Sequence, residues 1–177
     1  MLWPMQCVLN QPLYTARLRL EPVTPAIAAA ARAGQAAFED VLGAHAPEDW
    51  RQASLGLVAR SDVGAAPMRA VAIDRADETV VGDVRFEPSP RAAREFELGY
   101  AVARSRRRQG YAVEAAGAVV DWLFADGGAE CVIAGCDKAN IPSIRTLRRL
   151  GFWLDSNPGT TFWWLINPQL RIEAARF

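Results

Sequence analysis

The sequence predicts an α/β fold built on a mixed, mainly antiparallel sheet with helices on both of its faces. Two segments with the residue pattern of strands, 68–74 and 79–87, are joined by a short polar turn and followed by a third such segment, so three neighbouring strands are expected to be antiparallel. Amphipathic helical segments precede this group and alternate with the strands that follow it. A sheet in this order buries both faces when helices pack on each of them.

Length and composition indicate one ordered domain. The chain has 177 residues, of which 51% are hydrophobic and 23% charged, with no repeat or low-complexity segment. Lys and Arg together number 20, as do Asp and Glu, so the formal net charge is zero and we expect no nucleic-acid partner. No apolar run approaches the ~20 residues that span a bilayer, and the first residues lack the basic segment of a signal peptide, so we expect no membrane association.

Cysteine and histidine usage narrows the chemistry further. Cys131 and Cys136 lie five residues apart on a predicted strand, so their side chains point to opposite faces and do not pair, which favours a reduced, cytoplasmic protein. His45 is the single histidine, which excludes a His-rich metal site, and we expect no metal. Its position in a polar connection favours a solvated loop histidine over a catalytic one.

The N-terminal part of the chain is expected to contribute an extension, one strand and the first helices. Residues 1–12 are predicted to be an N-terminal extension of a single domain that spans residues 13–177. Thr24 followed by Pro25 is typical of the N-cap and first turn of a helix. The expected elements are a strand at 15–22, helices at 25–32 and 35–41, a polar connection at 43–53 and a short helix at 54–60.

The C-terminal part is expected to alternate strands and helices. Apolar residues with a period of two predict a central strand, and the amphipathic stretch after it predicts a helix that Gly127 and Gly128 end. The expected elements are the central strand at 94–103, the helix that follows it, a buried strand at 131–136, a helix from Asn140 to Arg149, and closing strands near 152–155 and 160–166.

The stretch SRRRQGYA, between the central strand and the following helix, carries the strongest functional signal. A strand that turns through a short glycine-bearing loop into a helix presents free backbone N–H groups and the positive end of the helix dipole, which suit a phosphate. Arg107, Gly110 and Ala112 have the spacing R-x-x-G-x-A, in which Gly110 lets the backbone approach an anion. The alternative is a solvated basic loop or a nucleic-acid patch formed by the arginines between 104 and 108.

This stretch resembles the acetyl-CoA signature of the GNAT acyltransferases, [RQ]-x-x-G-x-[GA] after a strand. The longer run LGYAVARSRRRQGYAVEA and the opening T-x-R-L-x-L of the first strand are similar to the branch that acetylates ribosomal-protein N-termini, and the resemblance covers residues 13–166. It implies an N-acetyltransferase that passes the acetyl group of acetyl-CoA directly to a primary amine in a ternary complex. The acceptor would be a protein N-terminus or a small amine.

The resemblance also implies cofactor-binding residues. The pyrophosphate of acetyl-CoA is expected at backbone N–H groups of the loop and first helical turn, with the Arg107 side chain supplying charge. The pantetheine arm is expected to pair with the central strand at Tyr100 and Val102, whose backbone would polarise the thioester carbonyl. The expected backbone donors are those of Arg108, Gln109, Gly110, Tyr111 and Ala112.

A second family-like segment opens the last predicted helix. Asn140 and Ser143 form N-x-x-S ahead of Leu150-Gly151-Phe152, which resembles the N-x-x-[SA]…GF segment that lies beside the cofactor in the family. Asn140 is expected to cap the helix and to contact the cofactor. Leu147 stands where many family members carry a tyrosine that protonates the leaving thiolate. Either Ser143 or solvent therefore serves as the general acid, or the chain is a poor catalyst and Ser143 is simply a first-turn residue.

Glu97 is the first choice for the base that takes the proton of the amine. It precedes Leu98-Gly99-Tyr100, a place where related enzymes often carry a glutamate, and Gly99 leaves room for an acceptor. The alternative is an ordinary surface glutamate. Glu95 shares the same face as a weaker candidate, and Glu87 is placed to attract a cationic acceptor.

An aromatic run, Phe162-Trp163-Trp164, lies on the last predicted strand. Strand alternation places at least one of these rings on the opposite face from its neighbours. That ring would be either a homodimer contact or a wall of the acceptor site.

Two other classes of function remain open from the sequence. A non-catalytic acyl-CoA-binding module of the same fold fits the missing tyrosine, and it would bind acetyl-CoA without releasing CoA when amines are present. A polyanion-binding or RNA-binding protein would use the arginine run and show steep salt dependence, which the neutral net charge disfavours. The sequence specifies neither the acceptor nor the oligomeric state.

Overall fold

The structure is a computed structural model that describes residues 9–61 and 68–174, and its strands form one eight-stranded sheet in the order β1-β2-β3-β4-β5-β6-β8-β7. Neighbouring strands are antiparallel except β5 and β6, which are parallel. This arrangement confirms the predicted α/β fold. The strands are β1 (Leu13–Tyr14), β2 (Leu18–Pro22), β3 (Arg69–Asp74), β4 (Thr79–Pro88), β5 (Glu95–Val102), β6 (Cys131–Asp137), β7 (Trp153–Ser156) and β8 (Thr161–Ile166).

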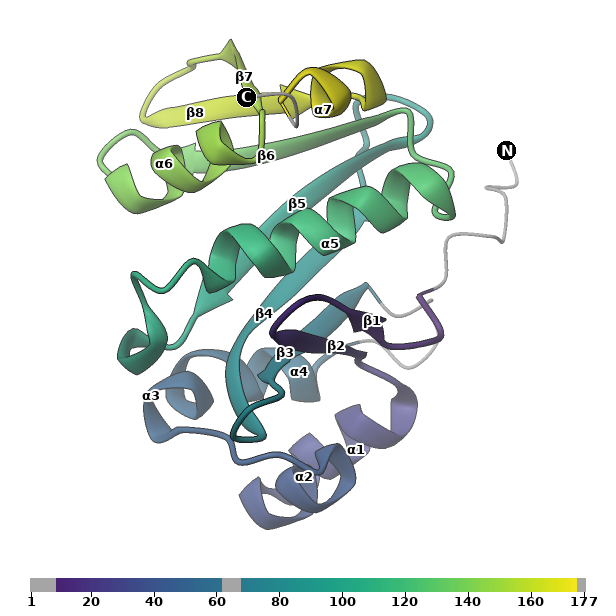
Figure 1. Ribbon diagram of the computed structural model, residues 1–177, viewed down its shortest axis with the longest axis vertical. Coiled ribbons are helices and arrows are strands. Elements are labelled where there is room, and N and C mark those ends of the chain that lie inside the picture. The colour runs from purple at the N-terminus through teal and green to yellow at the C-terminus, as the bar shows by residue number, and fades with distance from the viewer. Residues whose placement is uncertain (1–8, 62–67, 175–177) are drawn as a thin grey trace.

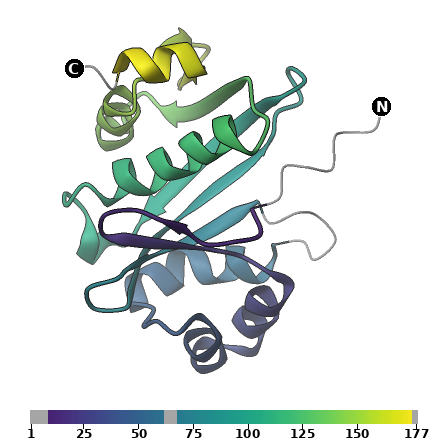
Figure 2. The same ribbon diagram turned by 45° about the vertical axis from the view of Figure 1, so that its right-hand side comes forward.

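Helices cover both faces of the sheet, and a separate apolar core lies under each group (Figures 1 and 2). The α5 and α6 helices pack on one face, here called the α5 face, and α1 to α4 pack on the other, the α1 face, over β2, β3 and β4. The helices are α1 (Pro25–Ala33), α2 (Gln35–Leu42), α3 (Glu48–Trp50), α4 (Gly56–Ala59), α5 (Tyr111–Ala125), α6 (Ile141–Arg149) and α7 (Pro168–Ala174).

The parallel pairing of β5 with β6 is short. It joins Glu95 to Cys131, Phe96 to Val132 and Glu97 to Ile133, and beyond these pairs β5 continues beside β4 while β6 continues beside β8. Figure 1 shows the two strands spreading apart past this point. We call the space between residues 98–102 of β5 and 134–137 of β6 the opening.

The helix start signals act as the sequence predicts. The Thr24 side chain accepts a hydrogen bond from the Ile27 backbone at 3.3 Å, and Pro25 follows in the first turn of α1. The Asn140 side chain accepts a hydrogen bond from the Ser143 backbone at 3.2 Å and so caps α6. These local caps fix the positions at which both helices begin.

The chain between residues 48 and 53 differs from the prediction of a polar connection at 43–53, whereas the helix predicted at 54–60 is present. The chain from 48 to 59 is helical throughout, because a π-helical turn (Arg51–Leu55) joins α3 to α4. The physical reason is Trp50, which is only 1% exposed and stacks on Phe38 with ring centroids 5.6 Å apart. Its indole N–H also donates to the Asp83 carboxylate of β4 at 3.2 Å. Burying this ring against the sheet draws the polar segment into a helix.

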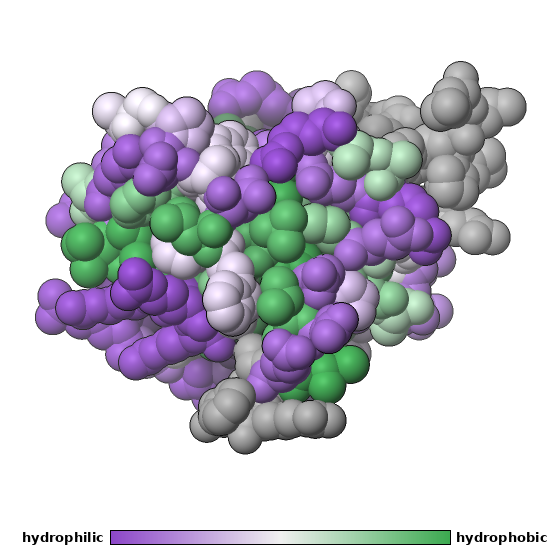
Figure 3. Space-filling model, turned by 90° about the horizontal axis from the view of Figure 1, so that it is seen from above, coloured by the Kyte–Doolittle hydropathy of each residue, from purple (hydrophilic) through white to green (hydrophobic). Residues whose placement is uncertain are grey.

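Both ends of the described chain add features that the sequence did not predict. Of the predicted extension at 1–12, residues 1–8 lie outside the described residues, whereas Leu9 is buried in the α5-face core. The α7 helix was not predicted, and Arg171 holds it by an ion pair to Asp121 of α5 at 2.7 Å. Figure 3 looks onto the end of the molecule that carries β7, β8 and α7, where hydrophobic residues are interspersed with hydrophilic ones.

Trp50→Ala should destabilise the fold strongly. Removing this buried ring leaves a cavity between α3 and β4, which typically costs about 3–5 kcal/mol of unfolding free energy. Urea denaturation measures the change. Trp153→Ala is the matched control, because Trp153 is 65% exposed and its loss should change the unfolding free energy by about 0.5 kcal/mol or less. Equal effects of the two substitutions would show that Trp50 does not organise this region.

Candidate functional site

The N-terminus of α5 lies at the end of the loop that follows β5. Gly110 has a left-handed backbone with φ of +86° and directly precedes the helix, and Arg108 has a φ of +62°. Within the described chain no side chain caps α5. The backbone N–H groups of its first turn are therefore available to an anion, and the helix dipole adds to their positive potential.

Acidic residues of neighbouring elements tether the loop before α5. Asp49 of α3 accepts a hydrogen bond from the Ser105 backbone at 2.8 Å, and this bond lowers the pKa of Asp49. Asp77 accepts from Arg106 at 2.6 Å, and this contact lowers the pKa of Asp77. A lowered pKa means that the tether contributes fully above the ordinary aspartate pKa of about 3.9 and is lost as the pH falls through the lowered value.

The arginines of this loop therefore differ in their surroundings. Arg106 is held by Asp77, while Arg107 donates from Nε to the Val102 carbonyl at 3.2 Å. Arg104 and Arg108 are exposed. The Arg107 side chain lies along the end of β5. Its positive charge, which was expected to serve the pyrophosphate, therefore lies beside the end of the opening at Val102.

Arg17 also reaches this loop, although it was not among the predicted site residues. It donates to the Gln109 carbonyl at 2.9 Å and forms an ion pair with Glu114 at 2.6 Å. Its guanidinium carbon lies 4.4 Å from the centre of the Tyr111 ring, and a Cβ placed on Gly110 would stand 3.4 Å from its Nη2. The T-x-R-L-x-L pattern of the first strand was the sequence signal that could have identified it.

Tyr100 and Ser143 meet on the α5-face side of the opening. The Tyr100 hydroxyl donates to the Ser143 backbone carbonyl at 3.3 Å, which links β5 to the first turn of α6. Burial raises the pKa of Tyr100 to about 12, so this hydroxyl stays protonated at neutral pH. Leu147 is only 1% exposed and lies in the α5-face core. The predicted residues Tyr100, Ser143 and Asn140 thus come together, while Leu147 contributes packing alone.

The glutamates near the opening have different environments. Glu97 is partly exposed and lies 3.6 Å from Nη2 of Arg85, whose Nη1 is 2.5 Å from Glu87. Glu95 is buried and accepts a hydrogen bond from the Ser89 hydroxyl at 2.6 Å. Because Glu95 is enclosed in this way, it does not present a carboxylate to an acceptor. Glu97 and Glu87 have partly exposed carboxylates near the opening.

Other reactive side chains have ordinary structural surroundings. Cys131 and Cys136 are both free, and burial raises the pKa of Cys131 to about 11 and also raises the pKa of Cys136. His45 is 63% exposed and pairs with Glu39 at 3.0 Å, as a solvated loop histidine does. Among the described residues there is no cluster of three or more metal-ligating side chains, and none of their helices is long and apolar enough to cross a bilayer.

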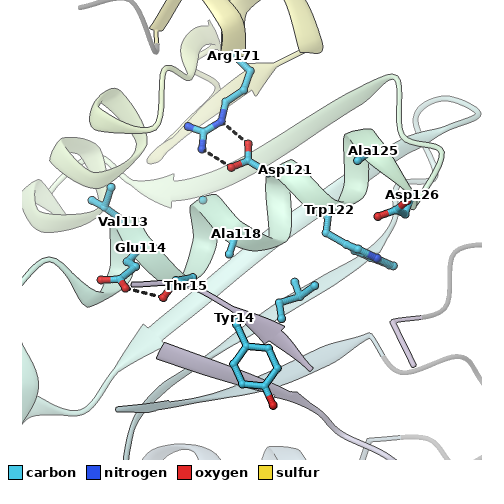
Figure 4. Close-up of a pocket in the computed structure, with 12 residues that line it drawn as sticks. Tyr14, Thr15, Val113, Glu114, Ala118, Asp121, Trp122, Ala125, Asp126 and Arg171 are labelled. Carbon is cyan, nitrogen blue, oxygen red and sulfur yellow. Dashed lines mark hydrogen bonds and ion pairs between the residues drawn. The ribbon is translucent and has the colours of Figure 1, made fainter. Parts of the chain in front are cut away.

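A hollow of about 530 Å³ runs along the outer side of α5, beside β1 and α7 (Figure 4). Four of its polar side chains pair with each other, because Arg171 binds Asp121 and Thr15 donates to Glu114. None of the predicted site residues lines it. The candidate site is therefore the opening with its adjoining loop, and not this hollow.

Comparisons with known proteins point to one family. A family model described as an acetyltransferase (GNAT) domain matches residues 17–153. The uncharacterized N-acetyltransferase YjdG of Bacillus subtilis is 33% identical over 86 residues, which cover 49% of this chain and 51% of that protein. The chain spans about half the length of the curated relatives it matches.

Solved structures share the fold at lower identity. An acetyltransferase of the GNAT family from Bacillus anthracis superposes with a TM-score of 0.65 at 17% identity, covering 90% of this chain and 99% of that one. Mycobacterium smegmatis RimJ in complex with CoA-disulfide gives a TM-score of 0.58 at 20% identity, covering 90% and 89% of the two chains. At these identities the likeness concerns the fold.

Asp77→Asn should loosen the loop before α5 without unfolding the protein. The substitution removes the charge that holds Arg106, and an exposed ion pair contributes only about 0–1 kcal/mol to global stability. Hydrogen exchange at pH 7 should therefore become faster in residues 104–110. Glu130→Gln, which breaks the exposed pair with Arg94, should leave this segment unchanged. Unaltered exchange in the Asp77 variant would contradict the tether.

Proposed function

The chain belongs to the acetyltransferase (GNAT) family, and on this premise we propose that it is an N-acetyltransferase that uses acetyl-CoA and a primary amine. One observation carries the proposal: the opening between β5 and β6 leads to an uncapped helix N-terminus preceded by Gly110. An elongated ligand with a phosphate at one end matches both features. The complexes that RimJ forms with CoA-disulfide support a CoA ligand for this fold.

The residues around the opening fit acetyl-CoA. Gly110 has a φ of +86° and leaves the loop backbone open to a pyrophosphate, with donors from Arg108, Gln109, Tyr111 and Ala112. Among residues 9–61 and 68–174, no strand pairs with β5 past Glu97 on its β6 side. The backbone near Tyr100 and the N–H of Val102 can therefore pair with an extended arm, while the Val102 carbonyl accepts from Arg107. Asn140 and Ser143 at the start of α6 border the same space.

Acetyl-CoA supplies an acetyl group that is already activated as a thioester. Glu97 accepts the proton of the attacking amine, directly or through one water. Backbone N–H groups on the free edge of β5 stabilise the negative charge that develops on the carbonyl oxygen. Ser143 donates a proton to the leaving sulfur. The acceptor is a primary amine, either on a protein N-terminus or on a small molecule. We expect the reaction to take place in the reducing environment of the cytoplasm.

A non-catalytic acyl-CoA-binding module is the second candidate. Leu147 favours it, because a buried leucine replaces the tyrosine that serves as the general acid in many relatives and has no proton to donate. Incubation with acetyl-CoA and a panel of primary amines separates the two candidates. The enzyme releases free CoA in proportion to the amine, whereas the module binds acetyl-CoA and releases none.

Thermal unfolding with acetyl-CoA tests the donor site, with ATP as a polyphosphate control. A ligand present at a hundred times its Kd contributes about 2.7 kcal/mol, which raises the Tm of a domain of this size by about 5–10 °C. Gly110→Glu should abolish the shift, because a carboxylate there blocks and repels the pyrophosphate. Gly128→Glu is the matched control, since Gly128 also has a positive φ of 70° but lies past the other end of α5. An equal shift with ATP would refute a CoA-specific site.

Glu97→Gln should slow acetyl transfer by about 10²-fold or more, because general-base catalysis contributes about 10²–10⁴-fold. The acetyl-CoA thermal shift should be unchanged, since Glu97 lies on the acceptor side. Rates of CoA release under saturating acetyl-CoA provide the measurement. Glu130→Gln is the control, because Glu130 pairs with Arg94 outside the opening, and this variant should retain most of the rate. A full rate in the Glu97 variant would remove this residue from the mechanism.

A further inference from the structure

Two glycines stand opposite each other on the edges of the opening. The last pair between the strands joins Glu97 to Ile133, and Gly99 and Gly135 each lie two residues beyond it. Even-numbered residues of both strands, such as Leu98 of β5 and Ala134 of β6, lie in the α5-face core. Odd positions therefore point to the α1 face, and both glycines present their bare backbones there. Glycine inside a strand marks a place where another group approaches closely.

A large side chain from the outer neighbouring strand lies over each glycine. Arg85 pairs with Gly99, and its Nε and Nη2 would stand 3.3 Å from a Cβ on that glycine. Trp163 pairs with Gly135, and the outer atoms of its six-membered ring would stand 3.2 Å from a Cβ there. The opening is therefore bordered on this face by a guanidinium on one side and an indole on the other.

The two sides differ in charge. Arg85 is shared by Glu87 at 2.5 Å and Glu97 at 3.6 Å, so two carboxylates face one guanidinium and the group carries a net charge of −1. Trp163 presents a flat apolar surface that is partly exposed, whereas Phe162 and Trp164 turn to the α5-face core. We call Arg85, Glu87, Glu97 and Trp163 the acceptor frame.

We propose that the acceptor frame selects amines whose ammonium group is attached to a flat apolar group, the class represented by arylalkylamines. The ammonium lies on the side of Glu97 and Glu87, where the net negative charge favours it. The apolar group lies on the Trp163 ring, where stacking stabilises it. Trp163 is thus a specificity-determining residue, and this inference rests on the proposed function of the opening as the acetyl-CoA site.

Bisubstrate conjugates test the frame without requiring turnover. CoA is linked through its sulfur and an acetyl spacer to 2-phenylethylamine in one conjugate and to methylamine in the other, and calorimetry gives both affinities. The phenylethyl conjugate should bind the wild type at least tenfold more tightly than the methyl conjugate. Trp163→Ala should bring this ratio close to one, while the affinity for acetyl-CoA stays unchanged and confirms that the variant is folded.

Two further variants sharpen the test. Trp163→Leu keeps an apolar side chain but not the flat ring, so it should also lose most of the ratio. Trp153→Ala removes an exposed tryptophan of β7 and should retain the full ratio. The inference is overturned if the wild type binds the phenylethyl and methyl conjugates equally well, or if both Trp163 variants keep the wild-type ratio of these affinities. Failure of the wild type to bind acetyl-CoA contradicts the proposed function itself.

The charged side of the frame has its own readout. A third conjugate, built from phenylalanine, places a carboxylate beside the linked nitrogen. It should bind the wild type more weakly than the phenylethyl conjugate, because the frame is already net negative. Glu87→Gln removes one negative charge and frees Arg85 for the new carboxylate, so this penalty should shrink. If the carboxylate weakens binding by the same factor in the Glu87 variant, the acceptor frame does not select acceptors by charge.

Discussion

The short parallel contact between β5 and β6 is the constraint on which the candidate site depends. Only three residue pairs join the strands before β5 follows β4 and β6 follows β8. If the pairing continued, the backbone groups of both strands would satisfy each other and the sheet would be closed. The divergence leaves two strand edges free inside a folded domain, with α5 and α6 packed over one side.

Charged side chains are distributed unevenly around the site, although the chain as a whole has zero formal net charge. Asp49 and Asp77 occupy hydrogen-bond donors of the loop before α5, so part of the arginine run serves to shape the loop. Arg17, which directly precedes β2, reaches the same loop and fixes it to α5 through Glu114. On the α1 face the balance reverses, since Glu87 and Glu97 outnumber Arg85. A neutral protein can thus present a cationic end and an anionic face within one opening.

Sequence patterns predicted most of the fold because the decisive signals were local. Period-two and helical patterns located β3 to β6 and α5, and Thr24 and Asn140 marked helix starts. The helical turns at 48–53 were missed because burial of Trp50 depends on Asp83, a residue of a distant strand. Glu87, Glu97 and one ring of the run Phe162-Trp163-Trp164 were expected near an acceptor, but their arrangement into the acceptor frame was not predicted. Strand register, which no local pattern specifies, places Arg85 over Gly99 and Trp163 over Gly135.

The three residue pairs between β5 and β6 also bear on the cooperativity of folding. They are the strand pairing between the β1–β5 half of the sheet and the β6-β8-β7 half, and the shared α5-face core and the Tyr100–Ser143 hydrogen bond add to it. A junction with so few hydrogen bonds is where sub-global unfolding begins most easily. A molecule that pairs with the free edge of β5 and packs against β6 adds contacts across the junction. Occupancy of the opening would therefore couple the unfolding of the two halves.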